Sequence, residues 1–62
     1  MIYFVRLFNN GHLIGDDMHL DVTYPEMVRR CHEAIRRVSL ERYGPDMPFR
    51  PRIQILKEID WE

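Results

Sequence analysis

The chain has 62 residues, a formal net charge of −1 and a single cysteine, which limits it to one small domain with one core and excludes an internal disulfide. A core of this size supplies only about 3–5 kcal/mol of stability, so added support from a partner is common. The apolar opening segment, residues 2–8, contains Arg6 and is too short to span a membrane, and nothing resembles a signal peptide, so we expect a cytoplasmic protein.

Residues 2–8 are rich in β-branched and aromatic side chains and predict a strand. The Asn10-Gly11 dipeptide that follows suits both central positions of a type I′ turn. We therefore expect a β-hairpin, in a register that places Leu7 opposite Ile14.

The returning strand is predicted to run from His12 to about Val22, because apolar and polar residues alternate along its second half. The same register places Tyr3 opposite Met18. Gly15-Asp16-Asp17 interrupts the pattern and predicts a bulge or a second turn at that point.

The sequence predicts a long amphipathic helix that begins after Thr23 and ends before Gly44. Thr23 and Glu26 have the spacing of a capping box, Pro25 fits the first turn, and Gly44-Pro45 is a stop signal. The predicted core stripe comprises Met27, Cys31, Ala34, Ile35 and Val38, with Val28 at its edge. The opposite side comprises Arg29, Arg30, Glu33, Arg36, Arg37 and Glu41. Four pairs on the helix have opposite charges four residues apart: Glu26–Arg30, Arg29–Glu33, Glu33–Arg37 and Arg37–Glu41.

After the helix, residues 45–51 contain three prolines and predict a stiff connection. A closing strand is expected from about Arg52, with Ile53, Ile55, Ile59 and Trp61 on one parity, a row that Lys57 interrupts. The element order is therefore β-β-α-β in a single domain, residues 1–62. We predict an α+β fold: a three-stranded antiparallel sheet, strand order 2-1-3, with the helix across one face.

One helix covers only one face of such a sheet. If Tyr3, Val5 and Leu7 face the helix, the remaining side chains of the first strand face away from it. Strand parity then gives an open face with these members: Ile2, Phe4, Arg6, Phe8, Leu13, Asp17, His19 and Asp21. Leu56 is a further candidate. An apolar patch of this kind is normally covered or used. The alternatives are a cover made by residues 45–51 or the C-terminal tail, with Phe49 or Trp61 as the lid, a second copy of the chain, or a different protein.

Candidate partner-binding residues therefore fall into two sets. On the sheet they are Phe4, Arg6, Phe8 and His19. On the outer side of the helix they are Arg29, Arg36 and Leu40, where a leucine surrounded by arginines is a candidate anchor; single exposed leucines are also common in proteins without a partner there.

No catalytic, metal or cofactor site is predicted. Cys31 and His32 are adjacent on a helix, so their side chains diverge by about 100° and cannot act together. His12, His19, Cys31 and His32 lack the spacing of a zinc site. We expect a protein that is not an enzyme.

The leading hypothesis is a non-catalytic protein-binding module, an inhibitor or accessory subunit of a larger assembly. In size and order of elements the chain resembles small inhibitors encoded by phages and mobile elements, among them anti-CRISPR proteins and phage inhibitors of RNA polymerase. The resemblance implies a protein partner, such as a nucleic-acid-handling complex, and carries over no residue.

The alternative is a single-stranded nucleic-acid-binding domain that uses the sheet aromatics and the helix arginines. The string from Ile2 to Leu7 resembles the first strand of RNA-recognition motifs, but the chain lacks the second ribonucleoprotein motif, a second helix and a fourth strand. Asp17 and Asp21 beside that surface would repel phosphate.

Overall fold

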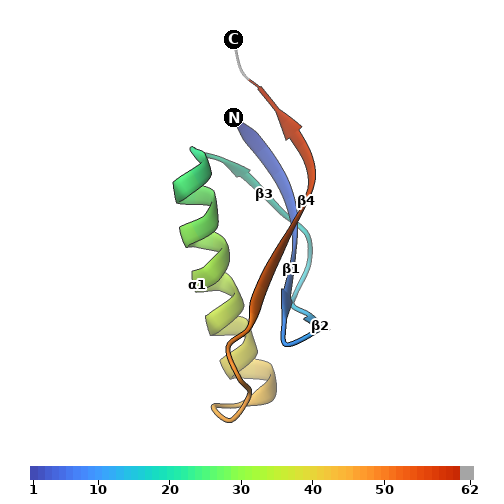
Figure 1. The fold of residues 1–62 in the computed structure, drawn as a ribbon, viewed down its shortest axis with the longest axis vertical. Coiled ribbons are helices and arrows are strands. Elements are labelled where there is room, and N and C mark those ends of the chain that lie inside the picture. The colour runs from blue at the N-terminus through green and yellow to red at the C-terminus, as the bar shows by residue number, and fades with distance from the viewer. Residues whose placement is uncertain (61–62) are drawn as a thin grey trace.

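The computed structural model describes residues 1–60 as an antiparallel sheet with one helix along one face (Figure 1). The elements in chain order are β1 Ile2–Asn9, β2 His12–Leu13, β3 Met18–Asp21, α1 Tyr24–Tyr43 and β4 Pro51–Ile59. β1 is central: β2 and β3 follow one another along one of its edges, and β4 pairs with the other. The predicted α+β fold and strand order are confirmed, with β2 and β3 forming the two pieces of the predicted second strand.

The β1–β2 hairpin turns at Asn10 and Gly11, whose φ angles are 51° and 82°. Positive φ at both central positions defines a type I′ turn, and asparagine and glycine adopt it with the least strain. The Ile14 amide donates a hydrogen bond to the Leu7 carbonyl at 2.8 Å. The predicted turn and the predicted Leu7–Ile14 pairing are both confirmed.

The register changes beyond Ile14. Tyr3 pairs with Leu20, so the predicted pairing of Tyr3 with Met18 is wrong by two residues. The cause is the interruption predicted at residues 15–17, which separates β2 from β3 and adds two residues to this edge. Because side chains alternate with a period of two, an insertion of two residues leaves every side chain on its predicted face.

The helix begins at Tyr24 after Thr23, whose extended backbone is typical of an N-cap residue. Among residues 1–60 no side-chain hydrogen bond caps this end, so the predicted capping box is wrong. The Glu26 carboxylate that the motif requires is bound instead by the guanidinium groups of Arg29 and Arg30. At the other end Gly44 has a φ of 82° and its amide donates to the Leu40 carbonyl at 3.0 Å, which ends the helix where predicted.

The core lies between α1 and the inner face of the sheet. Its buried apolar side chains are Tyr3, Val5, Leu7, Ile14, Met27, Cys31 and Ile35. The predicted helix stripe is thus confirmed at its centre, while Val28, Ala34 and Val38 are only partly buried. Among the 60 described residues no helix is long and apolar enough to cross a membrane.

The strand β4 contains an irregularity that the sequence did not reveal. Lys57 pairs with Phe4 but Ile55 pairs with Val5, so Leu56 is an extra residue opposite β1. A one-residue insertion exchanges the faces of everything beyond it. Ile53 therefore lies on the inner face, whereas Ile59 pairs with Ile2 on the outer one, and the single parity predicted for these isoleucines is wrong.

A buried polar pair joins the end of β1 to the end of α1. Asn9 is 1% exposed and Ser39 5% exposed. The Asn9 Nδ2 donates to the Ser39 hydroxyl at 3.0 Å, and the Asn9 Oδ1 accepts from the Arg50 amide at 2.7 Å. One side chain thus ties the central strand to the helix and to the proline-rich connection.

We expect Asn9→Ala to lower the free energy of unfolding by about 1–3 kcal/mol, because the Ser39 hydroxyl and the Arg50 amide both lose the buried side chain that they bind. Ser39→Ala should cost about 1 kcal/mol, and urea denaturation measures both. Since the two residues share one contact, the double variant should lose less than the two single losses combined. Losses below about 0.5 kcal/mol that simply add would contradict this role.

Candidate functional site

The outer side of the sheet, the open face, is built on the four residues of β1 that alternate with the buried ones. These are Ile2, Phe4, Arg6 and Phe8, and all four are half-buried. Their cross-strand neighbours are Leu13, Asp17, His19 and Asp21 on one side and Arg52, Gln54, Lys57 and Ile59 on the other. The structure thus brings the four predicted sheet residues, Phe4, Arg6, Phe8 and His19, onto one surface.

The two phenylalanine rings are flanked by polar side chains from the neighbouring strands. The His19 ring stacks on Phe4 with the centroids 4.9 Å apart and the planes 12° from parallel. The Arg52 guanidinium lies 5.5 Å from the centroid of the Phe8 ring. These contacts explain why the rings are half-buried, and they leave a surface of mixed apolar and charged character.

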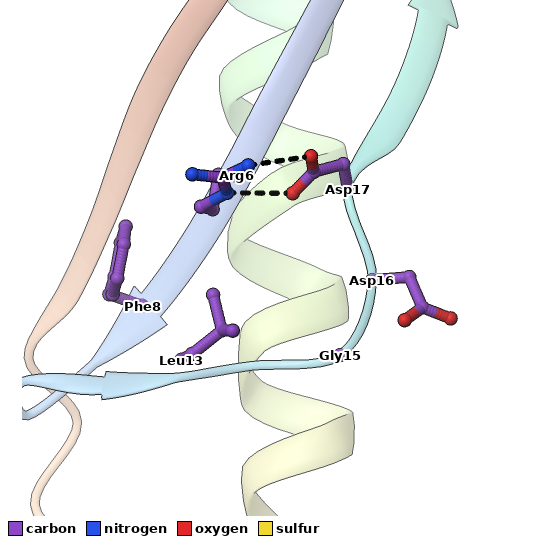
Figure 2. Close-up of a pocket in the computed structure, with 6 residues that line it drawn as sticks. All are labelled: Arg6, Phe8, Leu13, Gly15, Asp16 and Asp17. Atoms are coloured by element: carbon purple, nitrogen blue, oxygen red, sulfur yellow. Dashed lines mark hydrogen bonds and ion pairs between the residues drawn. The ribbon is translucent and has the colours of Figure 1, made fainter.

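Arg6 forms a two-point ion pair with Asp17 at the middle of the open face. The Arg6 Nε donates to Oδ1 at 2.9 Å and an Nη donates to Oδ2 at 3.0 Å. This hydrogen bonding lowers the pKa of Asp17 and raises the pKa of Arg6. Figure 2 shows the two groups pointing toward each other, while Asp16 points away from them. Arg6 is therefore a neutralised, oriented group, and little of its charge is free to attract a distant anion.

An open hollow of about 620 Å³ lies beside this ion pair, between β1 and the interruption that follows β2. Its lining comprises Arg6, Phe8, Leu13, Gly15, Asp16 and Asp17 (Figure 2). The side chains of Phe8 and Leu13 and the Arg6–Asp17 ion pair line it, while the Asp16 side chain points away, so the hollow suits a group with an apolar stem and a polar end.

Charge divides the open face along its length. Asp16, Asp17 and Asp21 lie on the β2–β3 side, which we call the acidic edge. Arg52 and Lys57 lie on β4, which we call the basic edge, opposite Phe8 and Phe4 respectively. Sequence parity did not place Lys57 on this face, because the extra residue Leu56 changes which side chains beyond it face outward.

The proline-rich connection does not cover the open face. Phe49 lies against the helix, with the Arg36 guanidinium 4.1 Å from its ring centroid and the His32 ring at 6.2 Å. The Arg50 carbonyl accepts from the Asn10 amide at 3.0 Å, which fixes the segment beside the β1–β2 turn. The cover predicted from residues 45–51 with Phe49 as its lid is therefore wrong, and Trp61, the other predicted lid, lies outside the described residues.

The predicted helix residues form a separate surface. Arg29 is bound by Glu26 and by Glu33, the latter at 2.6 Å. Arg36 stacks on Phe49, and Leu40 is 55% exposed beside them. Leu40 also borders a hollow of about 350 Å³ at the end of α1. These side chains lie on the helix side of the sheet, so the seven candidates make two surfaces rather than one.

Two of the four predicted ion pairs on the helix form, Glu26–Arg30 at 2.9 Å and Arg29–Glu33 at 2.6 Å. Within residues 1–60 the Glu33–Arg37 and Arg37–Glu41 pairs do not form. Glu26 also binds Arg29, so the charges gather at the start of the helix, where a carboxylate is favoured by the helix dipole.

Chemistry-bearing groups are sparse elsewhere. Among residues 1–60 no three His, Cys, Asp or Glu side chains are placed to hold a metal ion. Cys31 is buried, with its thiol 3.7 Å from the Met27 sulfur, and burial raises its pKa, which disfavours the reactive thiolate.

Comparison of the chain with protein-family models, with curated proteins and with solved structures gives no match.

The Glu26 cluster makes stability depend on pH. Hydrogen bonds from Arg29 and then Arg30 lower the pKa of Glu26 from 4.5 to about 2. Between these values the unfolded chain binds more protons than the folded one, so the stabilisation is complete above about pH 4.5 and is lost as the pH falls toward 2.

We expect Glu26→Gln to flatten the fall in stability between about pH 5 and pH 2.5. The measurement is the urea midpoint of wild type and variant at both pH values. Glu41→Gln removes the same group from the same helix outside the cluster and is the control, which should keep the wild-type pH dependence. An unchanged slope in Glu26→Gln would contradict the assignment.

Proposed function

We propose that the chain is a non-catalytic protein-binding module of the cytoplasm, a small inhibitor or accessory subunit of a larger assembly, which docks through its open face. The observation that carries the proposal is that the helix covers only one of the two faces of the sheet. The helix packs against the inner face of β1, and among residues 1–60 no segment lies over the outer one (Figure 1). Surfaces that keep aromatic side chains at the centre of a sheet without an internal cover are typical of interaction sites.

The composition of the open face favours a protein over a small ligand. Phe4 and Phe8 lie at its centre, and charged groups of both signs surround them. An apolar, aromatic centre with a polar rim is the common layout of protein interfaces. Arg6 adds a preorganised guanidinium, because its ion pair with Asp17 fixes the side chain before a partner binds.

Two further observations support a binding role without catalysis. The single thiol is buried in the core, and its neighbour His32 contacts Phe49 rather than the thiol. The resemblance in size and order of elements to phage-encoded inhibitors is compatible with this role and implies a larger protein machine as the target.

We expect Phe8→Ala to reduce capture of the partner from a lysate of the source cells at least about tenfold, since a central aromatic of an interface carries about 1.4 kcal/mol or more. Mass spectrometry of material bound to the immobilised chain measures the loss. Tyr24→Ala removes an exposed aromatic from the helix side and should capture as well as wild type.

Thermal unfolding of both variants provides the folding control. A partner lost on Leu40→Ala but retained by Phe8→Ala would place docking on the helix and overturn the open face as the site. Equal capture by every variant would overturn binding at either surface.

A single-stranded nucleic acid is the second candidate ligand, because Arg52 and Lys57 lie beside the two phenylalanine rings. Bases stack on aromatic rings while cations meet the phosphates. If the open face binds in this way, affinity for a fluorescent oligonucleotide should fall about tenfold or more over a fourfold rise in salt, and Arg52→Ala should reduce the salt slope by about one. Undetectable or salt-independent binding in fluorescence anisotropy would exclude this ligand.

A further inference from the structure

The charges of the open face are arranged so that the surface complements itself. The acidic edge, Asp16, Asp17 and Asp21, runs along one side of β1, and the basic edge, Arg52 and Lys57, runs along the other. Within the acidic edge Asp17 is ion-paired with Arg6, whereas the Asp21 side chain is 60% exposed and its Oδ1 lies 3.7 Å from the N-terminal ammonium. Between them lie the two phenylalanine rings. We propose that the open face of the free chain is occupied by a second copy of the chain, in a two-fold symmetric, face-to-face dimer. The inference rests on the proposed function, since it names an occupant for the same docking surface.

Symmetry selects one orientation for this dimer. A two-fold axis between the sheets and parallel to β1 keeps each position at its level along the strand and exchanges the two edges. The basic edge of one copy then faces the acidic edge of the other. An axis across the strands would instead place acid on acid and base on base, which costs several kcal/mol.

The contacts at each level follow from the register. Lys57 lies level with Phe4 and His19, so it meets the second copy's β3 next to Asp21. Arg52 lies level with Phe8 and Leu13, so it meets the hollow lined by Asp16 and Asp17. That hollow offers the apolar side chains of Phe8 and Leu13 to the arginine stem, and the Asp17 carboxylate, which is shared with Arg6, to its guanidinium.

The centre of the interface lies on the axis, where each side chain meets its own copy. Phe4 and Phe8 form apolar contacts there. The two Arg6 guanidinium groups also face each other, but each one is neutralised by Asp17 of its own chain at 2.9 and 3.0 Å, so the repulsion between them is small.

The edge of β4 is a weaker site for a second copy. An unpaired strand edge invites pairing with another chain, and proteins block it with proline, lysine and bulges. β4 carries Pro51, Lys57 and the extra residue Leu56. These features direct association to the face rather than to the edge.

The size of the face sets the expected affinity. Three strands about 4.8 Å apart and eight residues of about 3.3 Å give a surface of about 14 by 26 Å. This is below the roughly 800 Å² per partner of a standard interface. We therefore expect weak, reversible dimerisation, which a heterologous partner can displace.

Sedimentation equilibrium of the purified chain tests the dimer, from about 1 µM to 1 mM at low salt. Lys57→Glu and Asp21→Lys should each weaken dimerisation at least tenfold, because each creates two like-charge contacts across the axis. An equimolar mixture of the two variants should recover the dimer, since both contacts then have opposite charges again. The same recovery is expected when both changes are made in one chain. Glu41→Lys reverses a charge on the outer side of the helix and is the control, which should dimerise as strongly as wild type.

Circular dichroism checks that each variant is folded. The wild-type dimer should also dissociate as the salt concentration rises, which tests the charge contacts without any substitution. A wild type that stays monomeric up to 1 mM overturns the proposal, as does a dimer that both reversals leave intact or a mixture that fails to recover. A monomeric chain that still captures a partner through Phe8 overturns the dimer and leaves the proposed function standing. A dimer that depends on these charges, together with partner capture that does not depend on Phe8, supports the dimer and overturns the proposed function.

Discussion

The structure depends on a single helix packing against a sheet that has two faces. The side chains of β1 alternate, so Val5 and Leu7 are buried under α1 while Phe4 and Phe8 face outward. The outward rings are partly shielded from the side, by His19 in one case and Arg52 in the other. Each of these side chains lies over a face of its ring, and both rings remain half-buried on the outer side of the sheet.

Two irregularities, one on each side of β1, decide which side chains share the open face. Between β2 and β3 two residues are inserted, and an even insertion keeps the alternation, so Asp17, His19 and Asp21 lie where parity predicted them. In β4 one residue, Leu56, is inserted, and the odd insertion exchanges the faces beyond it. Lys57 and Ile59 thereby reach the open face, and the acidic edge acquires a basic counterpart.

The features that the sequence predicted are those that local rules determine, and the features that it missed depend on long-range pairing. The Asn10-Gly11 turn, the helix stripe around Cys31 and the stop at Gly44 follow from local rules, because backbone preference and periodicity determine them within a few residues. The bulge at Leu56 carries no glycine, and its one signal, Lys57 in the row of isoleucines, is also compatible with a regular exposed strand, so local rules could not locate it. The buried Asn9–Ser39 contact is likewise a long-range pairing of two common polar residues, 30 positions apart. The sheet candidates were therefore predictable, and Arg52 shares the parity of the predicted candidate Leu56, whereas the outward position of Lys57 was not predictable.

The use of the arginines argues for a protein partner more strongly than their number does. Arg6, Arg29 and Arg30 are bound by carboxylates of the same chain, and Arg36 lies on Phe49. On the open face the cations beside the rings are Arg52 and Lys57, set against three aspartates on the opposite edge. Asp17 is paired with Arg6, and Asp21 lies 3.7 Å from the N-terminal ammonium. A polyanion would gain two contacts and lie beside these carboxylates and Asp16, whereas a protein surface with charges of both signs can satisfy both edges at once.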